Sequence, residues 1–400
     1  MPSDARDVAV VGASVAGLFT AAKVAGEGLD VGILERAPTL PPAHRTLIAT
    51  HRVRKHLGSL GDASIVNEIQ NFELFADGVV ASVGLTRPDV IIERSALVRD
   101  LADHAQQSGA KIRLGTSFLG AEPSPSGMTV HVRNEATKRA ETLTTSTLVG
   151  ADGALSRVAR HAGWRPQTTV PLVQAQVRCP RGLPSDTVRV WFRPQETPYF
   201  YWLIPEGDGR GVVGLIGEER HAVRSQLEAF MRAHSLVPLG YQAARIPLYE
   251  RWTPAWKRMR SGAVYLVGDA AGHVKPSTVG GLVTGFRGAD AVADAILGRG
   301  RSALRSLRIE LDLHILLRRI LQRFGEDDYR RLLKLLEPAE HRLLASYSRD
   351  DTGRLLWRLG LRQPRLALVA LRVLISGRSH EEVSVGRTST QPAAQSSALT

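Results

Sequence analysis

Short apolar runs that end at glycine or at an acid dominate the beginning of the chain. Residues 8–11 form the first run, which ends at Gly12, and an Ala- and Leu-rich segment follows over Val15–Ala25. The run predicts a buried parallel strand, and the segment predicts a helix. A second apolar run, Val31–Leu34, ends at Glu35. Strand, glycine turn, helix and strand in this order predict one βαβ unit.

Residues 170–250 follow a different pattern, in which strand-like segments succeed one another. The segments cover residues 171–178, 187–193, 199–204 and 212–216, and one helix-like segment, residues 218–234, interrupts them. Apolar runs on both sides of Asp77-Gly78 also predict a hairpin over residues 72–83. Four of the six tryptophans fall between positions 191 and 256. We therefore predict a β-rich second lobe.

The pattern of the first lobe returns twice after its βαβ unit. Residues 95–107 predict a helix, and residues 130–132 and 147–149 predict strands, the second of which runs into Gly150-Ala151-Asp152-Gly153. Residues 263–267 predict a further strand, which ends at Gly268-Asp269 before a helix over residues 281–297. Residues 301–375 predict helix throughout, and the composition of residues 376–400 is typical of a disordered tail.

These patterns predict an α/β fold with two lobes and a helical end. The first domain is discontinuous, over residues 1–70, 91–165 and 255–300, and a β-rich substrate domain takes residues 71–90 and 166–254. A helical C-terminal region covers residues 301–375, and the tail covers residues 376–400.

Composition and charge exclude one class of partner and leave others open. The chain has 400 residues and 43% apolar content, which supports a large buried core. Its net charge of +13 suits anionic partners or is typical of an arginine-rich soluble protein. Because no compact Lys/Arg block with interleaved aromatic residues occurs, we expect no nucleic-acid binding.

The single cysteine, Cys179, can form no internal disulfide, and the sequence offers no set of zinc ligands. We therefore expect a cytoplasmic protein without a bound metal. The N-terminus lacks the pattern of a signal peptide, and no run of about 18 apolar residues predicts a spanning helix. The basic, Leu-rich region 301–375 is expected either to pack on the first domain or to contact an anionic membrane peripherally.

The glycine turn after the first strand carries the first chemical signal. Residues 12–17 read Gly-Ala-Ser-Val-Ala-Gly, a dinucleotide fingerprint whose middle glycine is Ser14. Gly12 makes the tight turn, Gly17 lets the helix pack on the strand, and the helix N-terminus offers N–H groups to a pyrophosphate. Glu35, at the end of the second strand, can accept hydrogen bonds from an adenosine ribose. Together they predict a bound dinucleotide.

Two later segments extend this predicted site. Asp152 and Asp269 each follow a predicted strand within a glycine-rich turn. Asp269 can accept hydrogen bonds from a polyol chain, and the helix after it directs N–H groups at the N1–C2=O edge of a reduced flavin. A nicotinamide dinucleotide needs only the first motif, whereas ribitol and isoalloxazine explain both later returns. The predicted cofactor is therefore FAD.

With these segments in order, the sequence resembles the aromatic-hydroxylase-like superfamily of FAD enzymes, and within it the geranylgeranyl reductase family. Residues 268–282, Gly-Asp-Ala-Ala-Gly-His-Val-Lys-Pro-Ser-Thr-Val-Gly-Gly-Leu, are close to that family's Gly-Asp segment. Residues 200–205, Phe-Tyr-Trp-Leu-Ile-Pro, are similar to its Tyr-x-Trp-x-Phe-Pro motif. Phe200 and Ile204 depart from that motif, and residues 44–50 replace the family's Cys-Gly segment. The resemblance covers most of residues 7–375.

The resemblance implies a Rossmann-like FAD-binding domain of the glutathione reductase and p-hydroxybenzoate hydroxylase type. An inserted β-rich substrate domain and a helical C-terminal region would complete the fold. It implies an FAD-dependent oxidoreductase that reduces carbon–carbon double bonds of an isoprenoid or another apolar, lipid-like substrate. The electron donor would be NAD(P)H or a ferredoxin.

The motifs and the resemblance together assign roles to individual residues. Those expected to bind the cofactor are Gly12, Ser14, Ala16, Gly17, Glu35, Arg36, Arg45, Arg94, Asp152, Gly268, Asp269, Ala270, Pro276, Gly280, Gly281 and Leu282. Those expected to contact the substrate are Phe200, Trp202 and Pro205. The candidate proton donors are Tyr199, Tyr201, His273 and Lys275. Core packing is the alternative role for the two tyrosines, and a local loop pairing is the alternative for Lys275.

Two other functions stay open at this point. A flavin monooxygenase or halogenase would bring reduced FAD to O₂, and Trp-x-Ile-Pro also occurs in flavin-dependent halogenases. A flavin-dependent sensor or scaffold would bind FAD without turnover.

Overall fold

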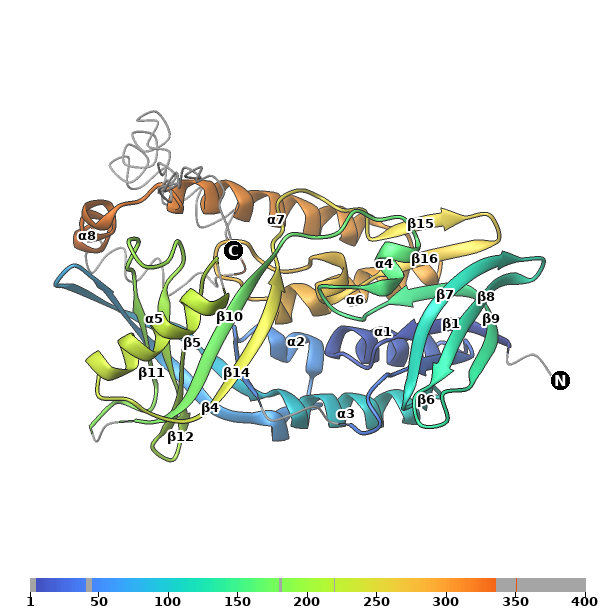
Figure 1. The fold of residues 1–400 in the computed structure, drawn as a ribbon, viewed down its shortest axis with the longest axis horizontal. Helices are drawn as coiled ribbons and strands as arrows, with labels where there is room; N and C mark the ends of the chain where they lie inside the picture. The colour runs from blue at the N-terminus through green and yellow to red at the C-terminus, as the bar shows by residue number, and fades with distance from the viewer. Residues whose placement is uncertain (1–4, 41–44, 180–181, 219, 336–349, 351–400) are drawn as a thin grey trace, which may run out of the picture.

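Two β-sheets with helices packed against them make up the described part of the chain (Figure 1). The structure is a computed structural model, and it describes residues 5–40, 45–179, 182–218, 220–335 and residue 350. The first sheet lies toward one end of the molecule and the second sheet toward the other, so the fold has the two lobes that the sequence predicts.

The first sheet is built around five parallel strands. Its order is β15-β16-β9-β1-β2-β6, in which β15 alone among these is antiparallel to its neighbour, as far as the described residues go. β7 and β8 extend β9 as an antiparallel meander. The strands are β1 (Ala5–Val11), β2 (Val31–Leu34), β6 (Lys111–Arg113), β7 (Thr116–Ser124), β8 (Gly127–Asn134), β9 (Ala140–Gly150), β15 (Trp256–Met259) and β16 (Gly262–Leu266).

The central strand β1 is buried on both faces, which explains its uninterrupted apolar run. Val8 and Val10 pack into a core with three helices, α1 (Val15–Ala25), α3 (Arg94–Gln107) and α6 (Leu282–Ile296). Ala9 and Val11 pack into a second core with the β7–β8 meander and the short helix α4 (Arg157–His161). A parallel strand that is covered on both faces needs no alternation of polar and apolar residues.

The second sheet is antiparallel except where β11 runs parallel to β4. Its order is β14-β10-β13-β12-β11-β4-β5-β3. Its strands are β3 (Thr46–Ala49), β4 (Ile65–Ala76), β5 (Val79–Glu93), β10 (Thr169–Arg178), β11 (Thr187–Trp191), β12 (Tyr201–Gly207), β13 (Arg210–Ile216) and β14 (Val237–Pro247). Two short elements, α2 (Val53–Leu57) and the 3-10 helix η1 (Asp62–Ser64), connect β3 to β4.

The two faces of the second sheet have different partners. Helix α5 (Arg220–Ala233) covers one face, where Tyr201 and Leu203 pack in a core with Phe230. The intervening residues of β12, Trp202 and Ile204, belong to a cluster on the opposite face. This alternation is the two-residue period of a β-strand, and it decides which side chains of β12 can meet a ligand.

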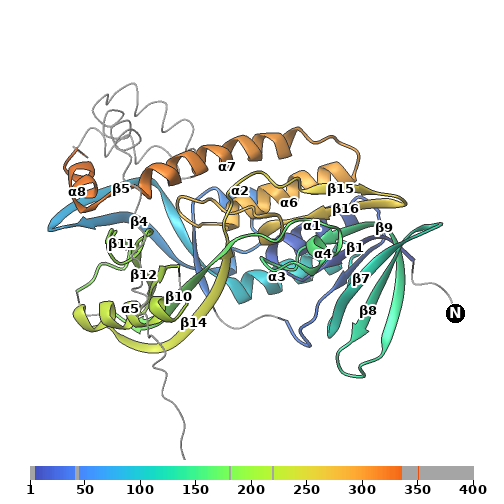
Figure 2. The same ribbon diagram turned by 45° about the horizontal axis from the view of Figure 1, so that its top comes forward.

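Two described helices follow α6 and connect the lobes. Helix α7 (Ser302–Leu321) lies alongside α6 in both views, and α8 (Glu326–Lys334) packs on the β4–β5 hairpin through Tyr329 and Leu333 (Figures 1 and 2). The prediction of helix throughout residues 301–375 is wrong at residues 322–325, which separate the two helices. The remainder of that region and the predicted tail, residues 376–400, lie outside the described residues.

The hydrophobic pattern of the sequence does not predict several of the strands. The predicted bounds of α1 and β2 agree with the structure, but β3, β6, β7, β14 and β15 were not predicted. β14 contains two prolines and a glycine and lies at the sheet edge with most side chains exposed, so it shows neither alternation nor an apolar run. β3 and the start of β4 pair within the second sheet, although they fall in the segment 1–70 that we assigned to the first domain.

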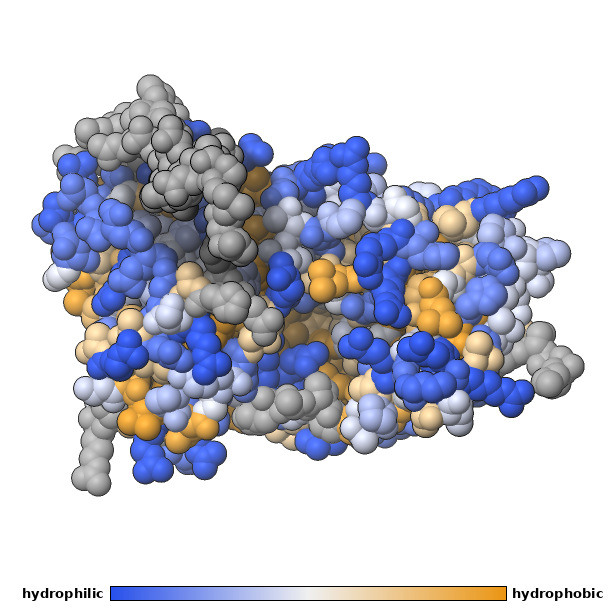
Figure 3. All heavy atoms as spheres, viewed as in Figure 1, coloured by the Kyte–Doolittle hydropathy of each residue, from blue (hydrophilic) through white to orange (hydrophobic). Residues whose placement is uncertain are grey.

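Polar residues cover most of the face shown in Figure 3, with small apolar patches between them. This is the ordinary surface of a folded protein, because apolar atoms always make up part of it. Within the described ranges, none of the helices has the length and apolar character needed to cross a membrane.

The close contact between α1 and the end of β9 generates a stability prediction. A Cβ atom at Gly17 would lie 2.7 Å from Ala151 Cβ and would also collide with Gly12 O. We expect Gly17→Ala to lower the free energy of unfolding by about 1–3 kcal/mol, although alanine is the better helix former. Chemical denaturation of the cofactor-free protein measures this change.

Gly285→Ala is the matched control, because its Cβ would meet nothing closer than Gly268 Cα at 3.9 Å. It should leave stability unchanged or raise it. Equal effects of the two substitutions would show that the predicted collision is absorbed without cost.

Candidate functional site

A cavity of about 850 Å³ lies where the carboxyl ends of the parallel strands face the second sheet. One half is lined by the glycine-rich turns of the first sheet and by several charged side chains. The other half is lined mainly by apolar side chains of the second sheet. Both halves belong to one continuous space, so a ligand in one half can touch a ligand in the other.

The turn between β1 and α1 forms the floor of the first half. Gly12 has a φ of +103°, and a Cβ there would lie 2.6 Å from Ala151 O, so only glycine fits this turn. Ser14 caps α1, and its Oγ accepts a hydrogen bond from Gly17 N at 3.2 Å. The first helical residues, Val15 and Ala16, line the cavity. A helix N-terminus at a concave surface favours an anion.

Glu35 links the end of β2 to this turn. Its Oε2 accepts a hydrogen bond from Ala13 N at 2.8 Å, and its Oε1 accepts one from Ala37 N at 2.8 Å. An ionised carboxylate has about four acceptor positions, so capacity remains for a ligand. Since Glu35 also lines the cavity, those free positions can serve hydroxyl groups there.

Two of the arginines that line the first half, Arg45 and Arg94, lie close to Asp269. Burial and the neighbouring Arg94 lower the pKa of Arg45, whereas Asp269 raises it. Burial also lowers the pKa of Arg94, against the charges of Asp269, Glu35 and Glu93. Arg45 Nε is buried and, within the described residues, has no hydrogen-bond partner. A buried guanidinium in this state gains free energy from an anion that occupies the cavity.

The third glycine-rich segment completes the lining of the first half of the cavity. The 3-10 helix η2 (Gly268–Ala271) follows β16, and burial raises the pKa of Asp269 against the charges of Arg45 and Arg94. A Cβ at Gly281 would lie 3.6 Å from Asp269 Oδ1, so the turn at the start of α6 approaches this carboxyl closely. Asp269, Gly280, Gly281 and Leu282 all line the cavity.

All of the predicted cofactor residues line the cavity except Gly17, Ala270 and Pro276. The carboxylate of Asp152 is already used by α4, because it accepts hydrogen bonds from Arg157 N at 2.6 Å and from Ser156 Oγ at 2.5 Å. Asp152 therefore supports the site by fixing α4.

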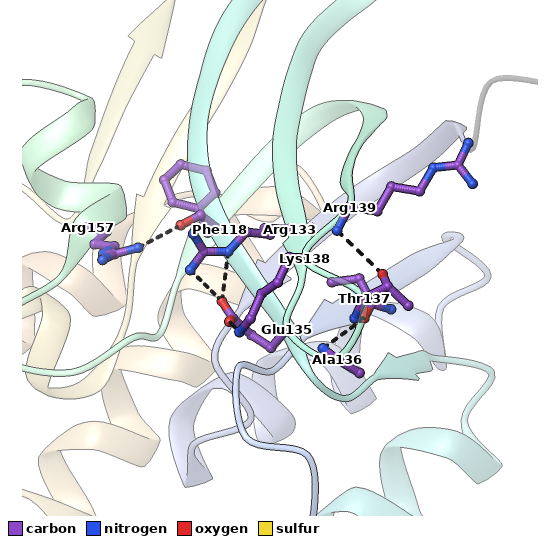
Figure 4. A network of polar contacts seen from close by, with 9 residues as sticks. Phe118, Arg133, Glu135, Ala136, Thr137, Lys138, Arg139 and Arg157 are labelled. Carbon is purple, nitrogen blue, oxygen red and sulfur yellow. Dashed lines mark hydrogen bonds and ion pairs between the residues drawn. The ribbon is translucent and has the colours of Figure 1, made fainter.

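Sequence reasoning missed one wall of the cavity. Thr116, Ser117 and Phe118 of β7 line it, together with Arg157 and Arg160 of α4. Figure 4 shows Arg157 donating to Phe118 O, at 3.4 Å, beside the ion pairs of Glu135 in the β8–β9 turn. No glycine motif marks β7, and tertiary contacts bring these residues to the cavity: β7 pairs with β8, and Thr116 N donates to Glu35 O at 2.8 Å.

The second half of the cavity has an apolar wall from strands of the second sheet. Its side chains from β3, β4, β10, β11, β12, β13 and β14 are Leu47, Ile48, Phe72, Leu172, Val188, Val190, Trp202, Ile204, Ile216 and Ile246. Gly214 makes room for the indole of Trp202 on the neighbouring strand, since a Cβ there would lie 2.5 Å from Trp202 Cζ2. Of the predicted substrate contacts, Phe200 and Trp202 line the cavity, and Pro205 does not.

The two tyrosine candidates lie outside the cavity wall. Tyr201 points toward α5, stacks on Phe230 and donates a hydrogen bond to Glu196 Oε2 at 2.5 Å. Burial, with Glu196, raises its pKa. Tyr199 is buried beneath the guanidinium of Arg318, which lies 3.6 Å from its ring centroid. The predicted role of either hydroxyl as a proton donor gains no support from this geometry.

His273 and Lys275 are also buried behind the wall. His273 is fully buried, burial lowers its pKa to about 4, and its two ring nitrogens have no hydrogen-bond partner within the described ranges. Its ring packs against the space left by Gly288. Lys275 Nζ pairs with Asp350 Oδ1 at 2.5 Å. Lys275 is therefore held in an ion pair, but its partner lies 75 positions away in the sequence and not in its own loop, as the local-pairing alternative expected.

The chain is similar to known flavoproteins over most of its length. A family model described as an FAD binding domain matches residues 5–299. Digeranylgeranylglycerophospholipid reductase 2 of Methanothermobacter thermautotrophicus is 28% identical over 384 residues, which cover 88% of this chain and 96% of that protein. The digeranylgeranylglycerophospholipid reductase of Methanocaldococcus jannaschii is 23% identical over 374 residues, with 90% and 91% coverage. These relatives confirm the resemblance to the geranylgeranyl reductase family.

Solved structures share the fold at low sequence identity. A geranylgeranyl bacteriochlorophyll reductase-like protein of Thermoplasma acidophilum aligns with a TM-score of 0.76 and 16% identity, over 92% of this chain and 99% of its own. The p-nitrophenol 4-monooxygenase of Pseudomonas putida aligns with a TM-score of 0.63 and 18% identity, over 93% and 97%. The predicted Rossmann-like fold with a strand-rich second sheet is confirmed, and FAD is the cofactor.

The residues present fit that cofactor. The glycine turn and the N-terminus of α1, the unpaired Nε of Arg45 among the described residues, and the acceptors Glu35 and Asp269 match a pyrophosphate with a polyol on each side.

The arginine pair generates a prediction about FAD affinity. We expect Arg94→Met to raise the dissociation constant for FAD roughly ten- to hundredfold, because a charge-assisted contact is lost. Titration of the apoprotein with FAD, followed by flavin fluorescence, measures the constant. Arg99→Met, on the exposed face of the same helix, should leave the constant unchanged. Equal affinities of wild type and Arg94→Met would remove Arg94 from the cofactor site.

The buried His273 generates a prediction about pH. Its pKa is about 4 in the folded protein against an ordinary 6.5, so between these values the unfolded chain binds a proton that the folded protein does not. Stability must therefore fall as the pH drops from 6.5 to 4, by roughly 3 kcal/mol at most. Denaturation of His273→Asn across this range should show a loss smaller by about that amount. A variant with the same pH slope as the wild type would contradict this.

Proposed function

We propose a function from one established point: this chain belongs to the FAD binding domain family and is an FAD-dependent oxidoreductase. The proposed reaction is the addition of hydrogen across carbon–carbon double bonds of an isoprenoid chain or of another apolar, lipid-like substrate. The observation that carries this proposal is the apolar half of the cavity, which is continuous with the half that fits FAD. The two digeranylgeranylglycerophospholipid reductases to which the chain is similar support the same class of substrate.

The apolar wall suits a long, weakly polar ligand. Gln174 is a polar side chain of β10 in this wall, and its Nε2 already donates to Gln242 Oε1 at 2.8 Å. The charged residues that line the cavity follow strands of the first sheet, belong to α4, or flank the paired ends of β3 and β5, as Arg45 and Arg94 do, and none of them lies within the apolar wall. A hydrocarbon chain therefore gains contact area along the second sheet, without leaving buried charges unpaired there.

Bound reduced FAD supplies the hydride in this reaction. The chain's own contribution is to hold the double bond close to the flavin and to exclude water, because an isolated alkene accepts hydride poorly. Trp202 and Phe200 provide the broad apolar surface for this positioning. No titratable group of the described residues lies in the apolar wall, so the accompanying proton arrives from the charged half of the cavity, from a side chain or a water molecule there.

The proposed reaction also needs an electron donor, for which we propose NAD(P)H or a ferredoxin. Peripheral contact with a membrane is supported by Ile309 and Leu316 of α7, which are 58% and 47% exposed on a helix rich in arginine.

An anaerobic single-turnover experiment tests the proposed reaction. The FAD-loaded protein is reduced with dithionite and mixed with a geranylgeranylated glycerolipid, while flavin absorbance and the mass of the lipid are followed. We expect the flavin to reoxidise without oxygen and the lipid to gain two hydrogens for each flavin. A flavin that stays reduced until air is admitted would overturn the proposal and favour a monooxygenase or a halogenase.

Two neighbouring residues of β12 provide the matched variants. Trp202→Ala should weaken lipid binding about tenfold or more, because its indole forms part of the wall. Tyr201→Phe should keep the single-turnover rate within about twofold, since its hydroxyl contacts Glu196 on the other face of the sheet. A large loss of rate in Tyr201→Phe would restore Tyr201 as the proton donor.

A further inference from the structure

We propose that Val279 determines the shape of the chain that the apolar half accepts. Its side chain narrows the cavity where the apolar wall meets the loop of residues 275–281. This inference rests on the proposed function, since it concerns the same apolar half.

The backbone of Val279 is the first sign of a special role. Its φ is +54°, in the left-handed region that glycine adopts freely and that β-branched residues avoid. The other described non-glycine residues with positive φ are Asp77, Lys138, Asp208 and Ser235. All four lie at hairpin turns or just after a helix, and none of them lines the cavity. Strain retained at a cavity wall points to a use for the side chain.

The surrounding structure forces this conformation. Val279 N donates to Lys275 O at 2.8 Å, and Lys275 N donates to Gly280 O at 3.1 Å, which closes a tight turn. Behind the turn, Lys275 pairs with the buried Asp350, and Ser277 Oγ lies 2.6 Å from His314 Nδ1 on α7. The loop is therefore fixed on the side away from the cavity, and Val279 cannot relax without breaking these contacts.

The side chain of Val279 faces the substrate wall. It lines the cavity and packs against the cluster that contains Leu172, Trp202 and Ile216. Gly280 and Gly281, which follow directly, line the half that fits FAD. The two methyl groups of Val279 thus occupy the junction of the two halves, where the bond to be reduced must come closest to the flavin.

Thermal unfolding of the cofactor-free protein tests the strain. Val279→Gly relieves the backbone and should keep the melting temperature of the wild type or raise it. Val79→Gly is the control, because Val79 is also half-buried against an apolar cluster but has ordinary strand backbone. It should melt several degrees lower. A similar drop of the melting temperature in both variants would show that the backbone of Val279 is not strained and would overturn the proposal.

Binding of two apolar probes to the oxidised, FAD-loaded protein tests the selection of shape. The probes are geranylgeraniol, which carries methyl branches, and hexadecan-1-ol, which carries none, and calorimetry gives the ratio of their dissociation constants. In Val279→Gly and in Val279→Ala this ratio should shift about tenfold in favour of the branched probe, as methyl groups in apolar pockets discriminate on this scale. A shift below twofold would overturn the proposal.

The probe-binding ratio and the reduction of lipid can fail independently of each other. A shifted ratio in a protein that reduces no lipid would support the role of Val279 and contradict the reductase. An unchanged ratio in a protein that does reduce lipid would leave the reductase standing and contradict Val279. If neither probe binds to the wild type, the role of Val279 fails, and turnover of the glycerolipid decides the reductase separately.

Discussion

The convergence of four parallel strands at one edge of the first sheet is the constraint on which the rest of the site depends. β16, β9, β1 and β2 are neighbours and run parallel, so their carboxyl ends meet. Four residues that are far apart in the sequence lie at these carboxyl ends. Gly150 is the last residue of β9, and Gly12, Glu35 and Gly268 come just after β1, β2 and β16. In open α/β sheets a ligand binds outside the carboxyl ends of the strands. The three glycine-rich segments therefore serve one cavity, which explains why the chain returns to the first sheet twice.

Close packing at this edge of the sheet restricts which residues fit there. Gly12 and Gly17 both approach Ala151, at the end of β9, within distances that leave no room for a Cβ atom. The N-terminus of α1 can then reach the cavity, and the half-buried Arg45 and Arg94 add positive charge beside it. Binding of an anionic cofactor and stability of the first lobe thus rest on the same contacts.

The second sheet contributes mainly apolar surface to the cavity. Its strands present alternate residues to α5 and to the cavity, and the cavity face is apolar. Buried ionisable groups near this face are held behind it, as Lys275 is by Asp350. The loop of residues 275–281 lies between the two sheets and carries the strained Val279 at the junction. The glycine-rich turns of the cavity therefore belong to one sheet, and its apolar wall belongs to the other.

The sequence by itself determined the βαβ unit, the return of the chain to the first sheet, and the glycine turns and acidic residues that line its half of the cavity. These features follow from local rules, because a glycine turn, a helix start and a buried parallel strand each have a short-range pattern. What the tertiary structure decided was the direction of individual side chains. Tyr201 and Trp202 are adjacent in the sequence, yet a strand turns one toward α5 and the other toward the cavity. The wall formed by β7, the burial of His273 and the positive φ of Val279 also depend on partners distant in the chain. No local pattern encodes such partners, since they come together only when the sheets pack.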